Sequence, residues 1–197
     1  VSCERITGIY QSSKMMSEMI DGLLTFYRLD SGKETLFKKP VNLKSISEML
    51  RLEYSAQATQ AGLTLTVHDH AEGVVIADKL KLLRIGRNLL SNAIKYSSSG
   101  DVLLITEYIN GIYTMSVHDN GTGMSIEQTA EIFKAFHRLG NAATKDGFGL
   151  GLSIVDSIVK LMKGTVSVES EKGKGSIFTV KLPMERADSP QNVTDCY

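Results

Sequence analysis

The sequence has no tryptophan, only three prolines and two cysteines in 197 residues, and a formal net charge of zero. Cys3 and Cys196 stand at opposite ends of the chain without metal-ligand spacing, so we expect free thiols in a reducing compartment. Because 22 basic residues balance 22 acidic ones, no overall field favours nucleic acid or an anionic membrane. We therefore expect no nucleic-acid partner, and any anion must be bound by local geometry.

Long hydrophobic runs are also missing. No apolar run approaches the ~20 residues of a bilayer span, and Val1 does not open a signal peptide. The sequence thus predicts no membrane segment in this chain. What is present is a hydrophobic content of 42%, enough for the core of one domain of ordinary size with a helical appendage.

The chain divides into three predicted parts. Residues 1–32 have an apolar seam at helical spacing, from Ile9 to Leu29, which Asp30-Ser31-Gly32 ends. This helix either docks on the following domain or pairs with another chain. Gly32-Lys33-Glu34 has the glycine and charged residues of a connection between two separate parts, which favours pairing. Residues 36–183 form the main domain, and the polar, patternless residues 184–197 are predicted to be disordered.

The main domain interleaves helices with antiparallel strands. Asn110-Gly111, between two alternating segments, is a strong signal for a two-residue hairpin turn. Asn42 is a candidate N-cap and Gly164 a candidate C-cap. The expected helices are 42–60, 78–99 and 149–163, and the expected strands are 37–41, 63–67, 74–76, 102–108, 113–118, 165–169 and 176–182. This order predicts an α+β fold, a two-layer α/β sandwich with a mixed sheet and an N-terminal helix.

The helix 78–99 has two distinct faces. Its broad apolar arc must be buried and comprises Leu82, Leu83, Leu89, Leu90, Ala93 and Ile94. Asn88, Asn92 and Lys95 cluster on the opposite side. Asparagine is a mediocre helix former, so two in mid-helix beside a lysine indicate either a solvated polar face or a binding face. This helix alone leaves both alternatives open.

Two glycine-rich stretches follow. Asp119-Asn120-Gly121-Thr122-Gly123 comes directly after a predicted strand. It is either a plain turn or a ligand-binding turn. In a binding turn, the Asp119 carboxylate would accept a hydrogen bond from an exocyclic amine such as that of adenine. Residues 147–152, GFGLGL, precede an apolar helix, where free N–H groups and the helix dipole can hold phosphate. No strand precedes them, and no Gly-Lys-Ser/Thr follows, so neither a Rossmann turn nor a Walker loop fits.

Between these stretches, residues 124–148 contain one short helix, with a capping box at Ser125 and Gln128. A loop of this length in a compact domain is usually a lid or a binding loop. We therefore expect a lid between the carboxylate and the second glycine-rich stretch.

These motifs, taken together in their order along the chain, are more specific than any one of them alone. Asn-x3-Asn-x2-Lys-Tyr, D-x-G-x-G, a lid, G-x-G-x-G-L and G-K-G together resemble the GHKL ATP-binding superfamily. More narrowly, the set resembles the catalytic domain of bacterial sensor histidine kinases, and Phe133, Phe136 and Arg138 resemble that family's phenylalanine box. The resemblance covers residues 36–183 and implies a Bergerat-type fold. Residues 6–32 resemble the second helix of the dimerisation hairpin.

This resemblance implies ATP and Mg²⁺ as cofactors and assigns roles by position. Asn92 would coordinate Mg²⁺, and Asn88 would orient the metal's waters or the γ-phosphate. Lys95 would neutralise phosphate charge, Tyr96 would pack near the adenine, and Asp119 would accept from the adenine amine. Further binding residues would be Gly121 and Gly123 around the adenine base, and Arg138, Lys145, Gly147, Gly149 and Gly151 at the lid. Leu150 and Leu152 would anchor the helix that follows the lid.

Asn88 also bears on the reaction. The chaperone, gyrase and mismatch-repair ATPases carry glutamate at this position as the base for water, whereas an amide accepts no proton at neutral pH. We therefore expect transfer of the γ-phosphoryl group to a protein nucleophile rather than hydrolysis. A nucleotide-gated regulatory module without phosphoryl transfer, and another GHKL hydrolase or serine kinase, are the alternatives.

The family's phosphoacceptor histidine has no counterpart among His68, His70, His118 and His137. We therefore expect a fragment whose acceptor helix belongs to the same or a partner kinase, with a response regulator receiver domain as second partner. The resemblance further implies a homodimer in the full-length protein and a cytoplasmic domain of a membrane-bound bacterial sensor.

Overall fold

The computed structural model describes residues 13, 16–17, 19–29, 31–137 and 148–187. Its main sheet has the strand order β2-β4-β5-β7-β6, with β2 parallel to β4 and the other pairs antiparallel. The strands are β2 (Thr64–His70), β4 (Asp101–Ile109), β5 (Ile112–Asp119), β6 (Thr165–Glu171) and β7 (Gly175–Pro183). A second, small sheet has the order β1-β3-β8, from β1 (Lys39–Asn42), β3 (Val74–Ala77) and β8 (Glu185–Arg186).

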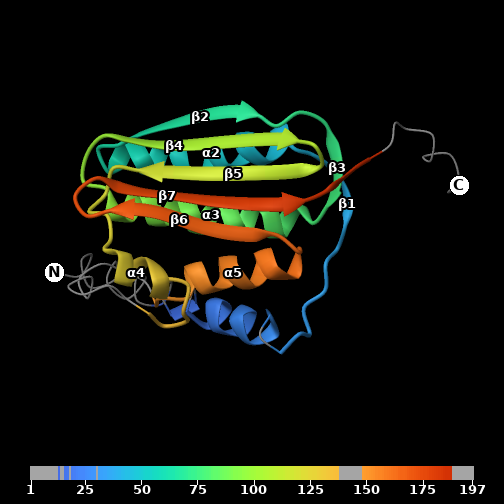
Figure 1. The fold of residues 1–197 in the computed structure, drawn as a ribbon, viewed down its shortest axis with the longest axis horizontal. Coiled ribbons are helices and arrows are strands. Elements are labelled where there is room, and N and C mark those ends of the chain that lie inside the picture. Colours follow the sequence, from blue (N-terminus) through green and yellow to red (C-terminus); the bar gives the residue numbers. More distant parts are fainter. Residues whose placement is uncertain (1–12, 14–15, 18, 30, 138–147, 188–197) are drawn as a thin grey trace, which may run out of the picture.

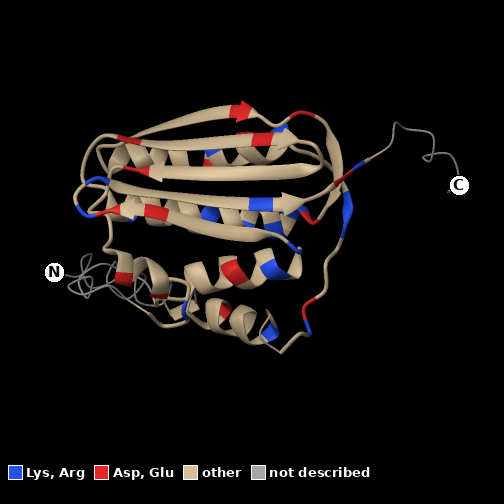
Figure 2. Ribbon diagram, in the orientation of Figure 1, with Lys and Arg blue, Asp and Glu red and all other residues tan. Residues whose placement is uncertain are grey.

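The helices lie against the main sheet. In Figure 1, α2 (Lys44–Gln60) and α3 (Lys79–Tyr96) run behind the strands, and α5 (Gly151–Leu161) packs beside α3 and along β6. The short α4 (Ile126–Glu131) also contacts β6. This arrangement confirms the predicted α+β sandwich with a mixed sheet. Lys, Arg, Asp and Glu are interspersed along the described elements, as Figure 2 shows.

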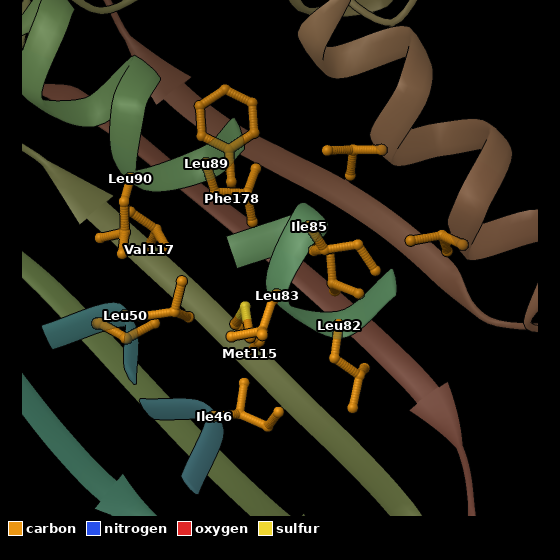
Figure 3. Packing of buried hydrophobic residues seen from close by; sticks show 14 of the residues in the cluster. Ile46, Leu50, Leu82, Leu83, Ile85, Leu89, Leu90, Met115, Val117 and Phe178 are labelled. Atoms are coloured by element: carbon orange, nitrogen blue, oxygen red, sulfur yellow. The ribbon is translucent and has the colours of Figure 1, made fainter. Parts of the chain in front are cut away.

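The core forms around α3. The five predicted positions Leu82, Leu83, Leu89, Leu90 and Ala93 are buried, while Ile94 is only partly buried. Figure 3 shows these leucines in one cluster with Ile46 and Leu50 of α2 and with the strand residues Met115, Val117 and Phe178. Helices α2 and α3 approach so closely at Gly86 that a Cβ there would lie 2.3 Å from Leu50 Cδ1. Apolar periodicity thus decides which face of α3 is buried, leaving its amides on the other.

Neither predicted cap residue is the cap of its helix, and the C-cap of α5 is Met162. Leu43, not Asn42, is the N-cap of α2, although Asn42 Oδ1 accepts a hydrogen bond from the Lys44 N–H at 3.1 Å. After α5, Lys163 rather than Gly164 adopts the left-handed conformation, with φ 59°. Gly164 is required for a different reason, because a Cβ there would lie 2.3 Å from the Lys181 carbonyl oxygen.

The prediction that disorder begins at residue 184 is wrong for residues 184–187. Met184 is buried, its carbonyl accepts from the Tyr108 hydroxyl at 3.0 Å, and β8 pairs antiparallel with β3. A two-residue strand has no detectable alternation, so only its pairing with an edge strand reveals it. Residues 188–197 lie outside the described part of the chain.

Residues 19–29 form a helix that docks through one face. Phe26 lies edge-on to Phe136, with ring centroids 6.2 Å apart and an interplanar angle of 69°. Its other face exposes Met19, Ile20, Leu23, Leu24 and Tyr27. Docking therefore occurs, and pairing of the exposed face with another chain stays a prediction. Across the described residues, no helix is long and apolar enough to span a bilayer.

Candidate functional site

The first half of the site is the polar face of α3. Asp78 caps this helix by accepting from the Lys81 N–H at 3.2 Å, and it also accepts from the Phe37 N–H at 2.9 Å. Asn88, Asn92 and Lys95 are half-buried on the face away from the core. The predicted clustering of these three side chains on one face is therefore present.

The Asn88 amide has a defined orientation. Its Nδ2 donates to the Arg84 carbonyl oxygen at 2.8 Å, which directs Oδ1 away from the helix backbone. A Cβ built on Gly151 would lie 2.8 Å from that oxygen. With Asn88 in this orientation, the close approach of the start of α5 to α3 leaves no room for a side chain at residue 151. Two segments distant in sequence, the amide face and the second glycine-rich stretch, meet here.

A cavity of about 310 Å³ opens beside this contact. Leu150, the N-cap of α5, makes no side-chain cap, so N–H groups of the first turn face this end with the positive end of the dipole. Arg84 also lines the cavity, and burial lowers the pKa of its guanidinium while Glu34 and Asp21 raise it. The lining residues are Asp21, Gly22, Arg84, Asn88, Phe148, Leu150, Gly151 and Ile154. The cavity combines a cation and helix N–H groups, which suits an anion.

The second half of the site lies at the end of β5. Asp119 is 8% exposed, and its Oδ1 accepts from the Gly121 N–H at 2.8 Å. Burial raises the pKa of this carboxyl, while hydrogen bonds from the Gly121 and Ser176 N–H groups and the nearby His118 lower it. The His118 ring has a pKa lowered by burial, opposed by Asp119 and Glu169. The Asp119 carboxyl is thus buried from solvent and hydrogen-bonded to backbone N–H groups.

The predicted glycines of this half are placed by close backbone approach. Gly121 forms an isolated antiparallel bridge with Ser97, and a Cβ on it would lie 2.7 Å from both Asp119 Oδ1 and the Tyr96 carbonyl oxygen. Gly123 has φ 59°, and a Cβ there would lie 1.9 Å from the Glu171 carbonyl oxygen. Any side chain at these positions would displace the loop that carries Asp119.

The remaining predicted residues fall into four groups. Lys95 Nζ lies 5.0 Å from the ring centroid of Tyr96, at the end of α3 nearest the Asp119 loop. At the lid, the Phe136 N–H donates to the Gly149 carbonyl at 3.0 Å, which joins the two described ends of this segment. Leu150 is buried, and Leu152 is packed against the core as an anchor of α5. Arg138, Lys145 and Gly147 lie outside the described residues.

Sequence reasoning missed two residues of this region. Arg84 precedes Asn88 by one helical turn, so the i, i+4 spacing that grouped the amides could have included it. Ser97 follows Tyr96 directly, and no local pattern separates it from the neighbouring serines. Its bridge to Gly121 is visible only in three dimensions.

With this geometry in place, the comparisons with known proteins identify the family. The family model of histidine kinase-, DNA gyrase B- and HSP90-like ATPases matches residues 77–186. The chain belongs to this family. Within it, the domain is a catalytic ATP-binding domain of the sensor histidine kinase type, as the resemblance predicted.

The curated relatives are sensor kinases. The sensor histidine kinase RcsC of Escherichia coli is 27% identical over 190 residues, covering 94% of this chain and 20% of RcsC. The autoinducer 2 sensor kinase/phosphatase LuxQ of Vibrio cholerae is 29% identical over 195 residues, covering 95% of this chain and 23% of LuxQ. The sensor protein SrrB of Staphylococcus aureus is 29% identical over 183 residues, covering 91% of this chain and 31% of SrrB. The chain thus spans under a third of the length of each of these relatives.

Solved structures agree. Full-length ShkA in complex with AMPPNP superimposes with a TM-score of 0.84 and 29% identity, over 93% of this chain and 39% of ShkA. The histidine kinase AdeS of Acinetobacter baumannii shares the fold with a TM-score of 0.77 and 23% identity, over 91% of this chain and 83% of the AdeS chain. The family and the AMPPNP-bound relative together support ATP as the ligand of this domain.

Proposed function

We propose that this chain binds ATP with Mg²⁺ and transfers the γ-phosphoryl group to a histidine on an acceptor helix of the same or a partner kinase. The phosphoryl group then passes to an aspartate of a response regulator receiver domain. The single observation that carries this proposal is the neutral Asn88 amide, whose oxygen faces the start of α5 at the lined cavity. A site that presents an amide there can position phosphate but cannot deprotonate water.

The nucleotide would lie along α3. Asp119 would accept a hydrogen bond from the adenine amine, with Gly121 and Gly123 shaping the slot for the ring. Tyr96 would pack near the base, and Lys95 would neutralise phosphate charge. At the other end, Gly147, Gly149 and Gly151 would allow the backbone to approach the triphosphate, with Arg138 and Lys145 as additional phosphate contacts. Support comes from two close approaches to the same helix α3, that of Gly121 to Tyr96 and Ser97 and that of Gly151 to Asn88.

The residues fit Mg²⁺ as an ion carried by the nucleotide. Among the described residues, no group of three His, Cys, Asp or Glu side chains could hold a metal. Mg²⁺ keeps several waters and binds mainly through substrate phosphates plus one or two protein oxygens. Asn92 would supply such an oxygen, and Asn88 would orient bound water or the γ-phosphate. Bound Mg²⁺ would neutralise charge on the β- and γ-phosphates.

Catalysis by this chain's own residues would then rest on positioning. Asn88 and the start of α5 would hold the terminal phosphate in line with an incoming imidazole, while Lys95 would neutralise phosphate charge. His118 lies on β5 beside Asp119, and His68 and His70 lie on β2, so none has the helical context that an acceptor needs. The acceptor would come from a separate helix.

The organisation of the whole protein is part of the proposal. Residues 1–32 would be the second helix of a dimerisation hairpin, and its exposed apolar face would complete a homodimer. The catalytic domain would extend from residue 36 to residue 187, because β8 belongs to the fold. We also propose a cytoplasmic location in a membrane-bound bacterial sensor, by analogy with the sensor kinases to which the chain is similar.

The test is transfer from γ-labelled ATP, with Mg²⁺, to a separately expressed acceptor-helix hairpin of a related sensor kinase. We expect an acid-labile, alkali-stable phosphoprotein, and Asn88→Glu should raise slow ATP hydrolysis by supplying a base. Ser91→Ala, on an exposed position of α3, is the matched control. Acid-stable product would point to a serine kinase. ATP binding with neither transfer nor hydrolysis would point to a nucleotide-gated module.

A further inference from the structure

Ser97, the residue that ends α3, has a buried hydroxyl without a hydrogen-bond partner. Its N–H donates to the Ala93 carbonyl at 3.1 Å, and the residue forms an isolated antiparallel bridge with Gly121. Leaving a buried hydroxyl unpaired is unfavourable, and native proteins keep few such groups. A hydroxyl of this kind, next to the site described above, therefore requires an explanation.

The bridge to Gly121 tells where this hydroxyl lies. Residues paired directly across an antiparallel bridge direct their Cβ atoms to the same side, about 4.5–5.5 Å apart. A Cβ built on Gly121 would lie 2.7 Å from Asp119 Oδ1. The Ser97 side chain and the Asp119 carboxylate are therefore on the same side of the bridge. No hydrogen bond joins them, because the Ser97 hydroxyl has no partner within the described residues, and Gly121 places no side chain between them.

The two groups have complementary chemistry. The Asp119 carboxylate only accepts hydrogen bonds, whereas the Ser97 hydroxyl can donate one. Adenine presents the matching pattern on one edge, with an amino donor at N6 and an acceptor at N1. Guanine presents the reverse, with an acceptor at O6 and a donor at N1. An acceptor and a donor side by side thus fit adenine, and a carboxylate facing O6 is unfavourable.

We infer that Ser97 is a specificity-determining residue that donates a hydrogen bond to adenine N1, directly or through one water, while Asp119 accepts from N6. This inference rests on the proposed ATP site. The hydroxyl that is unpaired in the free protein is paired in the nucleotide complex. The free protein thus carries an unsatisfied group whose partner is the base.

The test compares Ser97→Ala with the wild type in two measurements. Without nucleotide, the melting temperature should stay equal or rise, because the substitution removes an unpaired buried polar group. With ATP, Kd should increase on the order of 10-fold, as expected for one lost hydrogen bond. Ser91→Ala, exposed on the same helix, should change neither quantity.

The nucleotide 1-deaza-ATP, which lacks N1, completes a thermodynamic cycle. Wild type should bind it on the order of 10-fold more weakly than ATP, and Ser97→Ala should bind both nucleotides equally. Two binding results overturn the inference: an unchanged Kd for ATP in Ser97→Ala, or equal discrimination against 1-deaza-ATP in both proteins. A lower melting temperature of free Ser97→Ala also overturns it, since the hydroxyl would then have a structural partner. Failure of the wild type to bind ATP at all would instead contradict the proposed function.

Discussion

The two ends of the site are built differently. At the base end, Asp119 is buried, its loop is tied to Ser97, and glycines fill positions where a side chain would collide with backbone. At the phosphate end, Asn88 and Arg84 line a cavity that is also bordered by Asp21 and Gly22 of the N-terminal helix. One end is therefore made by a single folded unit, and the other is shared with a separately docked helix.

Under the proposed function, this difference assigns nucleotide affinity to the base end and phosphoryl transfer to the phosphate end. A prebuilt base pocket loses little ordering entropy when nucleotide binds, so it provides specificity and affinity. Under the proposed function, the phosphate end needs access for a second protein, because the acceptor histidine must approach the γ-phosphate. We infer that substitutions at the base end change affinity, and that substitutions at the phosphate end change transfer. The following predictions test that division, from the largest expected effect to the smallest.

Gly175→Ala should have the largest effect. Gly175 has φ 100°, and a Cβ there would lie 1.9 Å from the Asp119 carbonyl oxygen, which cannot move without displacing β5. Backbone strain plus overpacking should reduce the free energy of unfolding by about 3 kcal/mol or more and abolish ATP binding. Urea unfolding measures the first quantity and nucleotide titration the second.

Gly173→Ala is the matched control for this substitution. It lies in the same β6–β7 turn with φ 84°, but nothing lies within 4 Å of its Cβ position. Only the backbone conformation opposes alanine there, so the free energy of unfolding should fall by about 1 kcal/mol with ATP affinity retained. Equal losses in both variants would show that the close approach at Gly175 has no importance.

Asp119→Asn should have the next largest effect. Replacing a charged acceptor with an amide should increase Kd for ATP by about 10- to 100-fold, as measured by isothermal titration. The free protein should not lose stability at neutral pH, because burial raises the pKa of the folded Asp119 carboxyl above its ordinary 3.8.

The pH dependence has a definite sign. A carboxyl with a raised folded pKa contributes stability below its unfolded pKa, and that contribution is lost as pH rises through the folded pKa. Wild type should therefore lose stability relative to Asp119→Asn as pH rises from about 3.8 through the raised value. Melting curves of both proteins from pH 3 to pH 7 measure it, and parallel curves would contradict this sign.

Gly151→Ala tests the phosphate end. Its Cβ would lie 2.8 Å from Asn88 Oδ1, the end of a side chain that can rotate, so the fold should persist. Displacing that amide should slow phosphoryl transfer by roughly 10- to 100-fold, because small misplacements at a reacting group are costly. Adenosine affinity should be unchanged. A variant with weaker adenosine binding and normal transfer would reverse the proposed division.

His118→Gln should have the smallest effect, since it touches neither end of the nucleotide. Burial lowers the pKa of this ring, so its contribution to stability is present above the unfolded value near 6.5 and is lost as pH falls through the folded pKa. The variant should flatten the pH dependence of melting between pH 7 and 5 by well under about 1 kcal/mol, since solvent screens a partly exposed ring. An unaltered slope would assign that dependence to other groups.

Much of this molecule could be predicted residue by residue. The leucines of α3 repeat at helical spacing, and Asn110-Gly111 adopts the left-handed turn its residue types favour, with φ 51° and 80°. The capping box at Ser125 and Gln128 forms as expected. The N-cap at Leu43 and the short strand β8 could not be predicted, since the Leu43 N–H donates to the Gly73 carbonyl and β8 pairs with β3, both distant in sequence.

The sequence by itself determined which residues can do chemistry, because periodicity and glycine chemistry act over a few residues. It determined the buried face of α3, the amides opposite that face and the family pattern of the nucleotide site. Only the tertiary structure decided that Asn88 faces Gly151, that Ser97 pairs with Gly121 and that Phe26 docks on Phe136. These contacts join segments distant in the chain, so they depend on how closely packed elements can approach, which no local pattern encodes.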